Sequence, residues 1–306
     1  MRKFYRIFLL ALSCLSGFQS LRSQDSTDLL KLISPDPAKT RQYVTGAYKS
    51  SRVIMQQSLE NIPAGTMDFR ILHRFGLLKS GGDQFFGLDN AYFRMSFDFG
   101  ITKDLMVGIG RSAYLKEFDG FIKYRLLHQS TGWHEMPVTV SLVFGTTEIS
   151  SDISDIALRT DAPFSDRLAY FYQVILGRKF SDKLTLQISP TLIHRNLVKY
   201  AADHNDLYAL GLGGRLKLTH RLSLTADYFY DLNNYRGSGR HNAFSAGVDI
   251  ETGGHVFQLH VTNATGMNER AVIADTNYDW GKGEIAFGFN LSRSFNLKKS
   301  KKISFN

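Results

Sequence analysis

The chain has 306 residues, of which 43% are hydrophobic and 13% aromatic, with 26 Gly and 6 Pro. This composition supports a large folded core and excludes an intrinsically disordered protein. The formal net charge of +9 is unevenly placed, because four positive residues lie in the first 23 positions and four in the last nine, which leaves about +1 for the rest. Overall basicity therefore gives no support to a nucleic-acid-binding protein.

Residues 1–23 have the layout of a secretory signal peptide. A basic start precedes an apolar run over residues 7–18 and a polar exit, and the run is too short for a membrane-spanning helix. We expect cleavage near Ser23; the alternative is an amphipathic first helix of a soluble domain. The only cysteine, Cys14, lies inside the apolar run and faintly resembles a lipoprotein acylation site. Once the signal peptide is removed, the mature chain has no disulfide and no thiolate chemistry.

Residues 24–64 are rich in polar side chains and contain three prolines. We interpret them as a periplasmic lead-in and assign them no function. Within this segment, residues 52–59 are weakly patterned. They could add a further strand or lie inside the fold that follows.

From residue 65 onward, apolar and polar positions alternate in segments of roughly nine to thirteen residues, which is the length and period of a barrel strand. Phe93, Met95 and Phe97, for example, alternate with polar neighbours. No later stretch has eighteen consecutive apolar residues, so the sequence predicts no transmembrane helix. The predicted strands lie near residues 66–75, 90–100, 105–113, 119–129, 137–147, 166–179, 184–195, 206–218, 222–232, 241–251, 255–263 and 281–295.

The connections between these strands alternate between short and long, as they do in outer-membrane barrels. The tight joins are residues 101–104, 180–183, 219–221 and 252–254, and the long polar joins include residues 148–165, 196–205, 233–240 and 264–280. Two joins, 114–118 and 130–136, fit this parity less well. We predict an all-β protein: a single antiparallel up-and-down transmembrane β-barrel of about twelve strands over residues 65–297. A basic C-terminal tail, 298–306, follows, and the signal peptide would direct export to the bacterial outer membrane.

Several stretches also match a known family. They are residues 73–76, 85–89, 108–112, 119–124, 190–197 and 251–260. In these stretches the chain resembles the outer-membrane barrels of Bacteroidota catalogued as domain of unknown function 5777, over nearly the whole mature chain. The resemblance implies location and fold. It transfers no catalytic residue, because the family has no assigned activity.

If the apolar phase of the strands faces lipid, the other phase faces the lumen. The basic candidates, on the first eight strands, are Arg70, Arg74, Arg94, Lys123, Arg125, Arg167, Lys179, Arg215 and Lys217. The acidic candidates are Asp68 and Asp98 on the same strands and Asp227, Asp231, Asp249, Glu251 and Glu284 on the last four. These charges could set a transverse field across an open pore, or they could form a salt-bridged network that fills a narrow lumen. Twelve strands lie between the filled eight-stranded and the open sixteen-stranded barrels, so both alternatives stay open.

An outer-membrane hydrolase is the competing class of protein. His241 and Ser245 lie four apart on one predicted strand, but this spacing places them about 13 Å apart, which argues against a direct pair. His194, Asp203 and His204 lie near a predicted external loop. Spacing alone shows no triad geometry, so we predict no catalytic residues.

Two groups could bind a divalent ion. His128 and His134 flank a turn, and the run 203–206 combines hard oxygen ligands with one imidazole. Loop Asp and Asn are more often turn residues, so we predict neither a metal site nor a cofactor.

These observations favour a passive channel or porin for small polar solutes. The alternatives are a structural or assembly barrel with a closed lumen and an outer-membrane lipid hydrolase. The expected partners are membrane lipid and lipopolysaccharide, and the barrel-assembly machinery during insertion. We expect no nucleic acid, and the sequence does not identify the solute.

Overall fold

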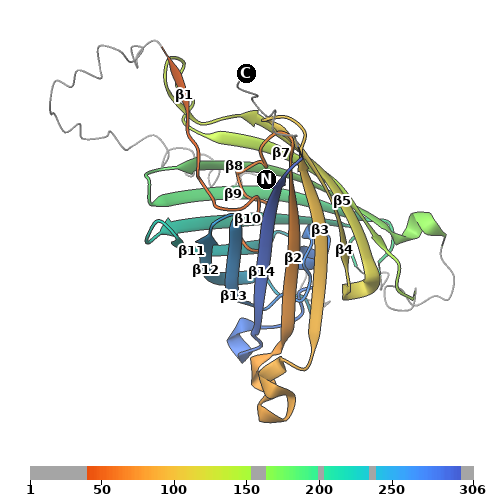
Figure 1. The fold of residues 1–306 in the computed structure, drawn as a ribbon. Helices are drawn as coiled ribbons and strands as arrows, with labels where there is room; N and C mark the ends of the chain where they lie inside the picture. The colour runs from red at the N-terminus through yellow and green to blue at the C-terminus, as the bar shows by residue number, and fades with distance from the viewer. Residues whose placement is uncertain (1–39, 153–162, 199–202, 234–238, 298–306) are drawn as a thin grey trace, which may run out of the picture. The chain divides into compact units, whose positions relative to one another are not determined.

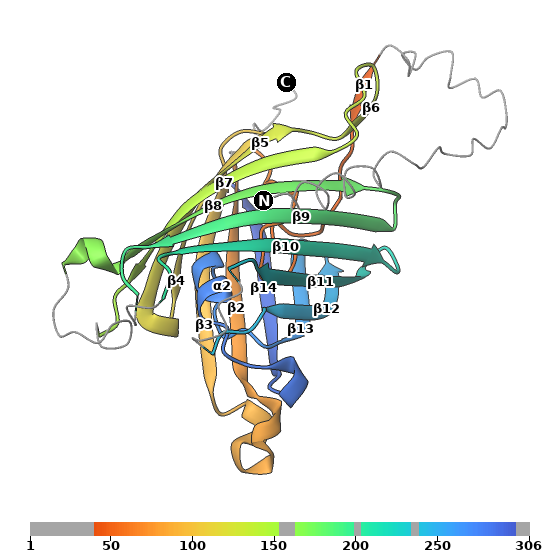
Figure 2. The same cartoon turned by 180° about the vertical axis from the view of Figure 1, so that it is seen from behind.

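The computed structural model describes residues 40–152, 163–198, 203–233 and 239–297. In these residues, twelve long strands close into an antiparallel barrel (Figures 1 and 2). The barrel strands are β2 (Thr66–Leu77), β3 (Ala91–Gly100), β4 (Leu105–Ser112), β5 (Glu117–Leu127), β7 (Thr139–Ile149), β8 (Leu168–Lys179), β9 (Leu184–Arg195), β10 (Asp206–Lys217), β11 (Leu222–Asp231), β12 (Phe244–Thr252), β13 (His255–Thr262) and β14 (Ala286–Asn296). Their order around the ring follows the chain, and β14 pairs with β2 to close it. The predicted fold class, a single up-and-down barrel, is confirmed.

Each predicted strand has a counterpart in the barrel, and β9 has the predicted bounds. The largest differences are at β12 and β14, which begin three and five residues later than predicted. Before β14, the chain forms the 3-10 helix η8 (Trp280–Lys282), where the side chain of Asp279 accepts a hydrogen bond from the Gly281 backbone at 2.8 Å. This local turn delays the extended backbone that the alternation alone would start at residue 281.

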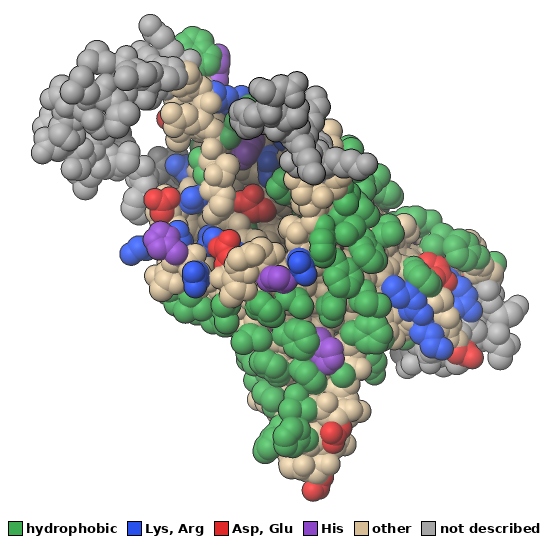
Figure 3. Space-filling model, viewed as in Figure 1, with side chains coloured by type: hydrophobic (Ala, Val, Ile, Leu, Met, Phe, Trp, Pro, Cys, Tyr) green, Lys and Arg blue, Asp and Glu red, His purple; other side chains and the backbone are tan. Residues whose placement is uncertain are grey.

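The two faces of the strands differ as the alternation predicts. On β3, the apolar residues Phe93, Met95 and Phe97 are 41–43% exposed, whereas Arg94 and Asp98 are at most 1% exposed. Figure 3 shows hydrophobic side chains covering much of the outer face. The outer surface is therefore apolar, as contact with lipid requires. The inner surface is mixed: polar side chains such as Arg94 lie beside a buried apolar cluster that includes Phe171 and Ile175.

One end of the barrel carries the short turns. In three of them a hydroxyl side chain accepts the backbone N–H of the leucine that opens the next strand: Thr102 to Leu105 at 3.0 Å, Ser181 to Leu184 at 3.1 Å and Thr219 to Leu222 at 3.0 Å. At the same end, β1 (Arg41–Tyr43) pairs with β6 (Ser130–Gly132) in a small separate sheet. This pairing explains why the join after β5 is long.

The opposite end carries the long loops, and the loop between β13 and β14 folds back into the barrel. It contains the helix α2 (Glu269–Ala274), all six residues of which are buried (Figure 2). None of the helices in the described residues is both long enough and apolar enough to cross a membrane. The sequence predicts a polar external loop here, and the structure differs because α2 finds polar partners inside the barrel.

Candidate functional site in the barrel interior

Residues 47–62, named here the plug, lie inside the barrel (Figure 1). The plug turns back on itself as a tight hairpin, because the Val53 backbone N–H donates to the Gln56 carbonyl and the Ser58 N–H to the Ser51 carbonyl, both at 2.9 Å. Its hydrogen bonds reach β2, β5, β9, β10, β11, β13 and β14. Only a segment surrounded by the strands can contact strands on so many sides of the ring. Of the two alternatives for residues 52–59, a further strand or a place inside the fold, the structure shows the second.

A single carboxylate holds the tip of the plug. Asp227 Oδ2, on β11, accepts hydrogen bonds from the backbone N–H groups of Ile54, Met55 and Gln56 at 3.1, 2.7 and 3.2 Å. Consecutive N–H groups of a tight turn form a concave anion site, and hydrogen bonds to an ionised group are stronger than neutral ones. Asp227 therefore recognises the backbone of the plug and not its side chains.

The carbonyl groups of the plug are satisfied by side chains of the strands. Lys123 Nζ, on β5, donates to the carbonyls of Ser58 and Glu60 at 2.7 and 2.6 Å. Further donors are Gln258 to Val53 at 2.5 Å, Asn290 to Ile54 at 3.1 Å, Gln187 to Gln57 at 2.7 Å, Arg125 to Leu59 at 3.2 Å and Arg215 to Ala47 at 3.2 Å. A buried carbonyl needs a donor, and Lys and Arg supply only donors. The basic inner surface is thus matched to the backbone of the plug.

Some side chains of the plug lack hydrogen-bond partners. The Tyr48 hydroxyl and both polar atoms of the Gln57 amide are buried without a hydrogen-bond partner. Burial, together with the nearby Asp227 carboxylate, raises the pKa of Tyr48 well above its usual range, so this phenol stays neutral.

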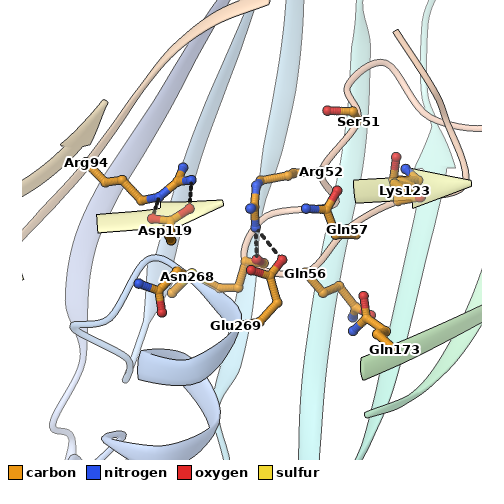
Figure 4. A network of polar contacts seen from close by, with 12 residues as sticks. Ser51, Arg52, Gln56, Gln57, Arg94, Asp119, Lys123, Gln173, Asn268 and Glu269 are labelled. Carbon is orange, nitrogen blue, oxygen red and sulfur yellow. Dashed lines mark hydrogen bonds and ion pairs between the residues drawn. The ribbon is translucent and has the colours of Figure 1, made fainter. Parts of the chain in front are cut away.

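Helix α2 meets the plug near the middle of the barrel. Arg52 Nη1 pairs with Glu269 Oε1 at 3.0 Å, and both side chains are 1% exposed (Figure 4). The helix begins after Asn268, whose side chain accepts the Ala271 N–H at 2.8 Å in the usual manner of a helix N-cap. The plug and the helix together occupy the centre of the lumen.

Ion pairs hold α2 against the wall. Arg270 pairs with Glu117 of β5 and with Asp275 at 2.6 Å, and Asn268 also donates to Glu117. Glu117 is fully buried. Because both members of the Arg270 and Glu117 pair are desolvated, loss of either would leave a buried charge.

The predicted basic residues mostly lie inside the barrel. Arg70 donates to the hydroxyls of Ser50 and Ser51 at 3.0 and 2.9 Å, and it pairs with Asp68 at 2.6 Å and with Asp98 at 3.6 Å. Buried Arg94 donates through Nε to Asp119 at 2.8 Å (Figure 4). Lys123, Arg125 and Arg215 are the donors to the plug described above, whereas Lys217 is half-buried and makes no hydrogen bond to the plug in the described residues.

The predicted acidic residues divide into two groups. Asp98, Asp227, Asp249 and Glu251 face the interior, where Asp249 accepts from Thr225 at 3.2 Å and from Gln258 at 2.9 Å, and Glu251 pairs with Lys49. Asp231 and Glu284 lie at the long-loop end instead, where they pair with Arg240 at 3.1 Å and Lys79 at 2.6 Å. Glu284 precedes β14, because that strand begins later than predicted.

Two interior acids do not appear among the sequence-based candidates. Glu117 and Asp119 are buried on β5, in the same phase as Lys123 and Arg125. Asp119 opens the predicted strand 119–129, so the alternation that selects these two basic residues already places it inside, and Glu117 would have been found had the strand been started at residue 117. With them, the basic side of the lumen contains its own carboxylates, and local pairing takes the place of a field between two separate arcs.

The catalytic and metal candidates have other contacts. Ser245 Oγ bonds to Thr262 Oγ1 at 3.1 Å, and His241 lies before β12. His194 Nδ1 lies 2.6 Å from Asp206 Oδ1, and His128 stacks on the ring of Tyr43. The described residues contain no group of three or more His, Cys, Asp or Glu side chains that could hold a metal ion.

The chain belongs to the family of membrane-bound beta barrel domains DUF5777, whose match covers residues 48–295 and so includes most of the plug. Curated proteins give no match to the chain. Among solved structures, it resembles the NanC porin (10% identity, TM-score 0.47, covering 76% of this chain and 100% of the other) and the KdgM porin (8%, 0.44, 75% and 99%). It also resembles the outer membrane protein Omp33 of Acinetobacter baumannii (10%, 0.40, 75% and 98%). At these values the similarity supports no argument about activity.

Proposed function

We propose that this membrane-bound barrel is an outer-membrane channel for small polar solutes, closed by its plug in the conformation described here. Closed barrels of antiparallel strands with an apolar outer face and alternating short and long connections are typical of bacterial outer membranes. The architecture therefore favours an outer-membrane location. Because the plug fills the lumen, the plug must move before the barrel can conduct.

The observation that supports a channel is that the lumen is filled by the plug and by helix α2, and not only by side chains of the strands. In narrow barrels, the inward side chains of the strands meet and fill the interior themselves. Here the space between the strands accommodates a separate hairpin of backbone and the helix α2. If the plug leaves, Lys123, Arg125 and Asp227 become exposed to water, together with apolar residues of the wall such as Phe171 and Phe229.

The bonding of the plug is compatible with its release. Its apolar residues, among them Ile54 and Met55, pack in a buried cluster with strand residues such as Phe171, and its other contacts are hydrogen bonds and ion pairs. Water can replace each hydrogen bond when the segment withdraws. The net contribution of one such bond is about 0.5–1.5 kcal/mol, far less than its strength in isolation. A plug held in this way is closed at rest without being permanent.

A barrel with a permanently closed lumen is the second candidate. The buried pair between Arg52 and Glu269 favours it, because this pair joins the two elements that occupy the lumen. Separating the pair requires that both charges find new partners or water.

Conductance in planar lipid bilayers tests the proposal. We expect the purified wild-type protein to show rare or no opening, and a variant lacking residues 47–60 to show stable ohmic steps. A variant lacking residues 82–86, in the exposed loop after β2, is the matched control and should behave as the wild type does. If the plug deletion folds, as judged by β-sheet circular dichroism, and passes no current, the channel is excluded and the closed barrel is retained.

A further inference from the structure

A cavity of about 370 Å³ opens at the long-loop end of the barrel. Its walls come from the connections after β4, β7, β9, β11 and β13, and the described plug residues are not among those that line it. Small-molecule sites typically have volumes of about 300–1,000 Å³. The cavity is therefore large enough for a small solute and is distinct from the space that the plug fills.

Four arginines of the described residues line this cavity, and they come from separate parts of the chain. Arg167 precedes β8, Arg195 ends β9, Arg240 precedes β12 and Arg270 lies on α2. The lining carboxylates are Asp166, Asp203 and Asp275. The fold thus gathers guanidinium groups from four segments around one opening.

Among the described residues, two of these arginines are paired with carboxylates and two have no carboxylate partner. Arg270 pairs with Glu117 and Asp275, and Arg240 with Asp231. Arg195 Nη2 donates to the His204 carbonyl at 2.5 Å, and Arg167 Nη1 donates to the carbonyls of Ile149 and Ser151 at 3.1 and 2.7 Å. No carboxylate of the described residues lies within 4.0 Å of a charged nitrogen of Arg167 or Arg195. Carbonyl oxygens orient these two side chains, and the carboxylates of Asp275 and Asp203 attract Arg195 from a greater distance.

Three of the arginines that line the cavity keep an N–H group without a partner, as several other buried arginines of the described residues do. The Nε atoms of Arg195, Arg240 and Arg270 are buried and have no hydrogen-bond partner. A buried donor left unpaired is costly, and each guanidinium presents its N–H groups as a planar fork that matches a carboxylate or a phosphate. Because these Nε atoms have almost no accessible surface, a ligand in the cavity would be bound by the Nη groups of the same side chains.

We infer that this cavity binds a small anionic solute through a carboxylate or phosphate group, with Arg195 and Arg167 as its principal contacts. The inference rests on the proposed function only for the statement that the ligand is a transported solute. The cavity would bind the anion whether or not the barrel conducts. Arg270 directly follows Glu269, which pairs with Arg52 of the plug. The bound solute would therefore lie beside the contact that joins the plug to α2.

Isothermal titration calorimetry on the full chain in lipopolysaccharide-free detergent micelles tests the site, with glucose 6-phosphate as the anionic probe and glucose as its neutral match. We expect the phosphate ester to bind at least about tenfold more tightly than glucose and more weakly at high salt. Arg195→Gln should weaken phosphate binding by at least about tenfold, whereas Arg221→Gln, in an exposed turn at the opposite end, should leave it unchanged.

Equal affinity for both probes, or unchanged affinity in folded Arg195→Gln, would overturn the inference. If Arg195→Gln does not fold, Arg167→Gln, at a half-exposed position, provides the same comparison. Binding of lipopolysaccharide without binding of glucose 6-phosphate would also overturn the inference, because the phosphate that the cavity recognises would then belong to a lipid. If glucose 6-phosphate binds but the folded plug-deletion variant passes no current, the site is retained and the channel is excluded. If the variant conducts but glucose 6-phosphate does not bind, only the channel is retained.

Discussion

The plug and helix α2 both lie in the lumen, but different chemistry holds them. The backbone of the plug is bound by side chains of many strands, with Asp227 and Lys123 as the main contacts. The polar contacts of α2 are side-chain ion pairs, chiefly the pair of Arg270 with Glu117, and its residues Val272 and Ile273 share a buried apolar cluster with the plug. The polar attachment of the plug is thus shared among many weak hydrogen bonds, whereas that of α2 depends chiefly on one desolvated ion pair. The comparison indicates that the plug can be loosened gradually and that α2 is fixed by a few residues.

The two elements also differ in how they are attached. Helix α2 lies in the connection between β13 and β14, so strands of the wall fix both of its ends. The plug leads directly into β2 at its C-terminal side, while its N-terminal side is held by β1 and β6, which are three residues each. The plug is therefore the element that can withdraw while the ring of strands stays closed.

The largest effect is expected at α2. Arg270→Met leaves the Glu117 carboxylate buried with Asn268 as its remaining described partner, which should cost about 3–5 kcal/mol of stability. Urea unfolding in detergent micelles would measure it, with Arg221→Met, an exposed substitution, as the control within about 0.5 kcal/mol of the wild type. A loss below about 1 kcal/mol for Arg270→Met would contradict the concentrated binding of the helix.

A smaller effect is expected when a donor to the plug is removed. Lys123→Met leaves the carbonyls of Ser58 and Glu60 without this donor, at a cost of about 1–3 kcal/mol. Hydrogen exchange should be faster in residues 47–62 and unchanged in the strands. Lys217→Met, which removes a lysine without a described bond to the plug, should leave hydrogen exchange unchanged both in residues 47–62 and in the strands. Equally faster exchange of residues 47–62 in both variants would count against recognition of the plug through its backbone.

At the tip of the plug, Asp227→Asn keeps the shape of the side chain and removes its charge. The neutral amide oxygen accepts the three N–H groups less strongly, so the opening free energy of the plug should fall by about 1–2 kcal/mol. The measurement is the exchange rate of the Met55 amide, together with the open probability in bilayers. Slower exchange than in the wild type would be the opposite of the expected result.

The smallest effect is expected for a side chain of the plug itself. Gln57→Ala removes two buried polar atoms without partners and retains the backbone carbonyl that Gln187 binds. The opening free energy should change by less than about 1 kcal/mol, because the lost packing is offset by the removal of unsatisfied groups. A change as large as that of Lys123→Met would show that side chains, and not the backbone, hold the plug.

The sequence predicts the wall of the barrel far better than its contents. Strands alternate with a period of two, and a hydroxyl such as Thr102 or Ser181 marks a tight turn, so both signals are local. The same alternation places Arg94 and Lys123 inside. Local signals were enough for each of the twelve strands of the described barrel.

The plug was not predictable in the same way, because its conformation depends on donors and acceptors distant in the chain. Asp227 lies over 170 positions from the N–H groups it binds, and no short-range pattern marks such a partner. Helix α2 does have local signals, in the cap Asn268 and the apolar residues 271–274, but these do not reveal burial in a polar lumen. The sequence therefore leaves open whether the lumen charges set a field across a pore or fill a narrow lumen, and it does not show that many of them bind this segment.

The most direct test of the account is the accessibility of the tip of the plug. In a Cys14→Ser background, Met55→Cys places a thiol at a position that is 1% exposed in the wild type, and Lys103→Cys places one at a side chain that is 76% exposed. We predict that a membrane-impermeant maleimide labels Lys103→Cys rapidly and Met55→Cys slowly, and that adding Asp227→Asn accelerates only the second reaction. Rapid labelling of Met55→Cys with Asp227 intact would contradict a plug closed at rest.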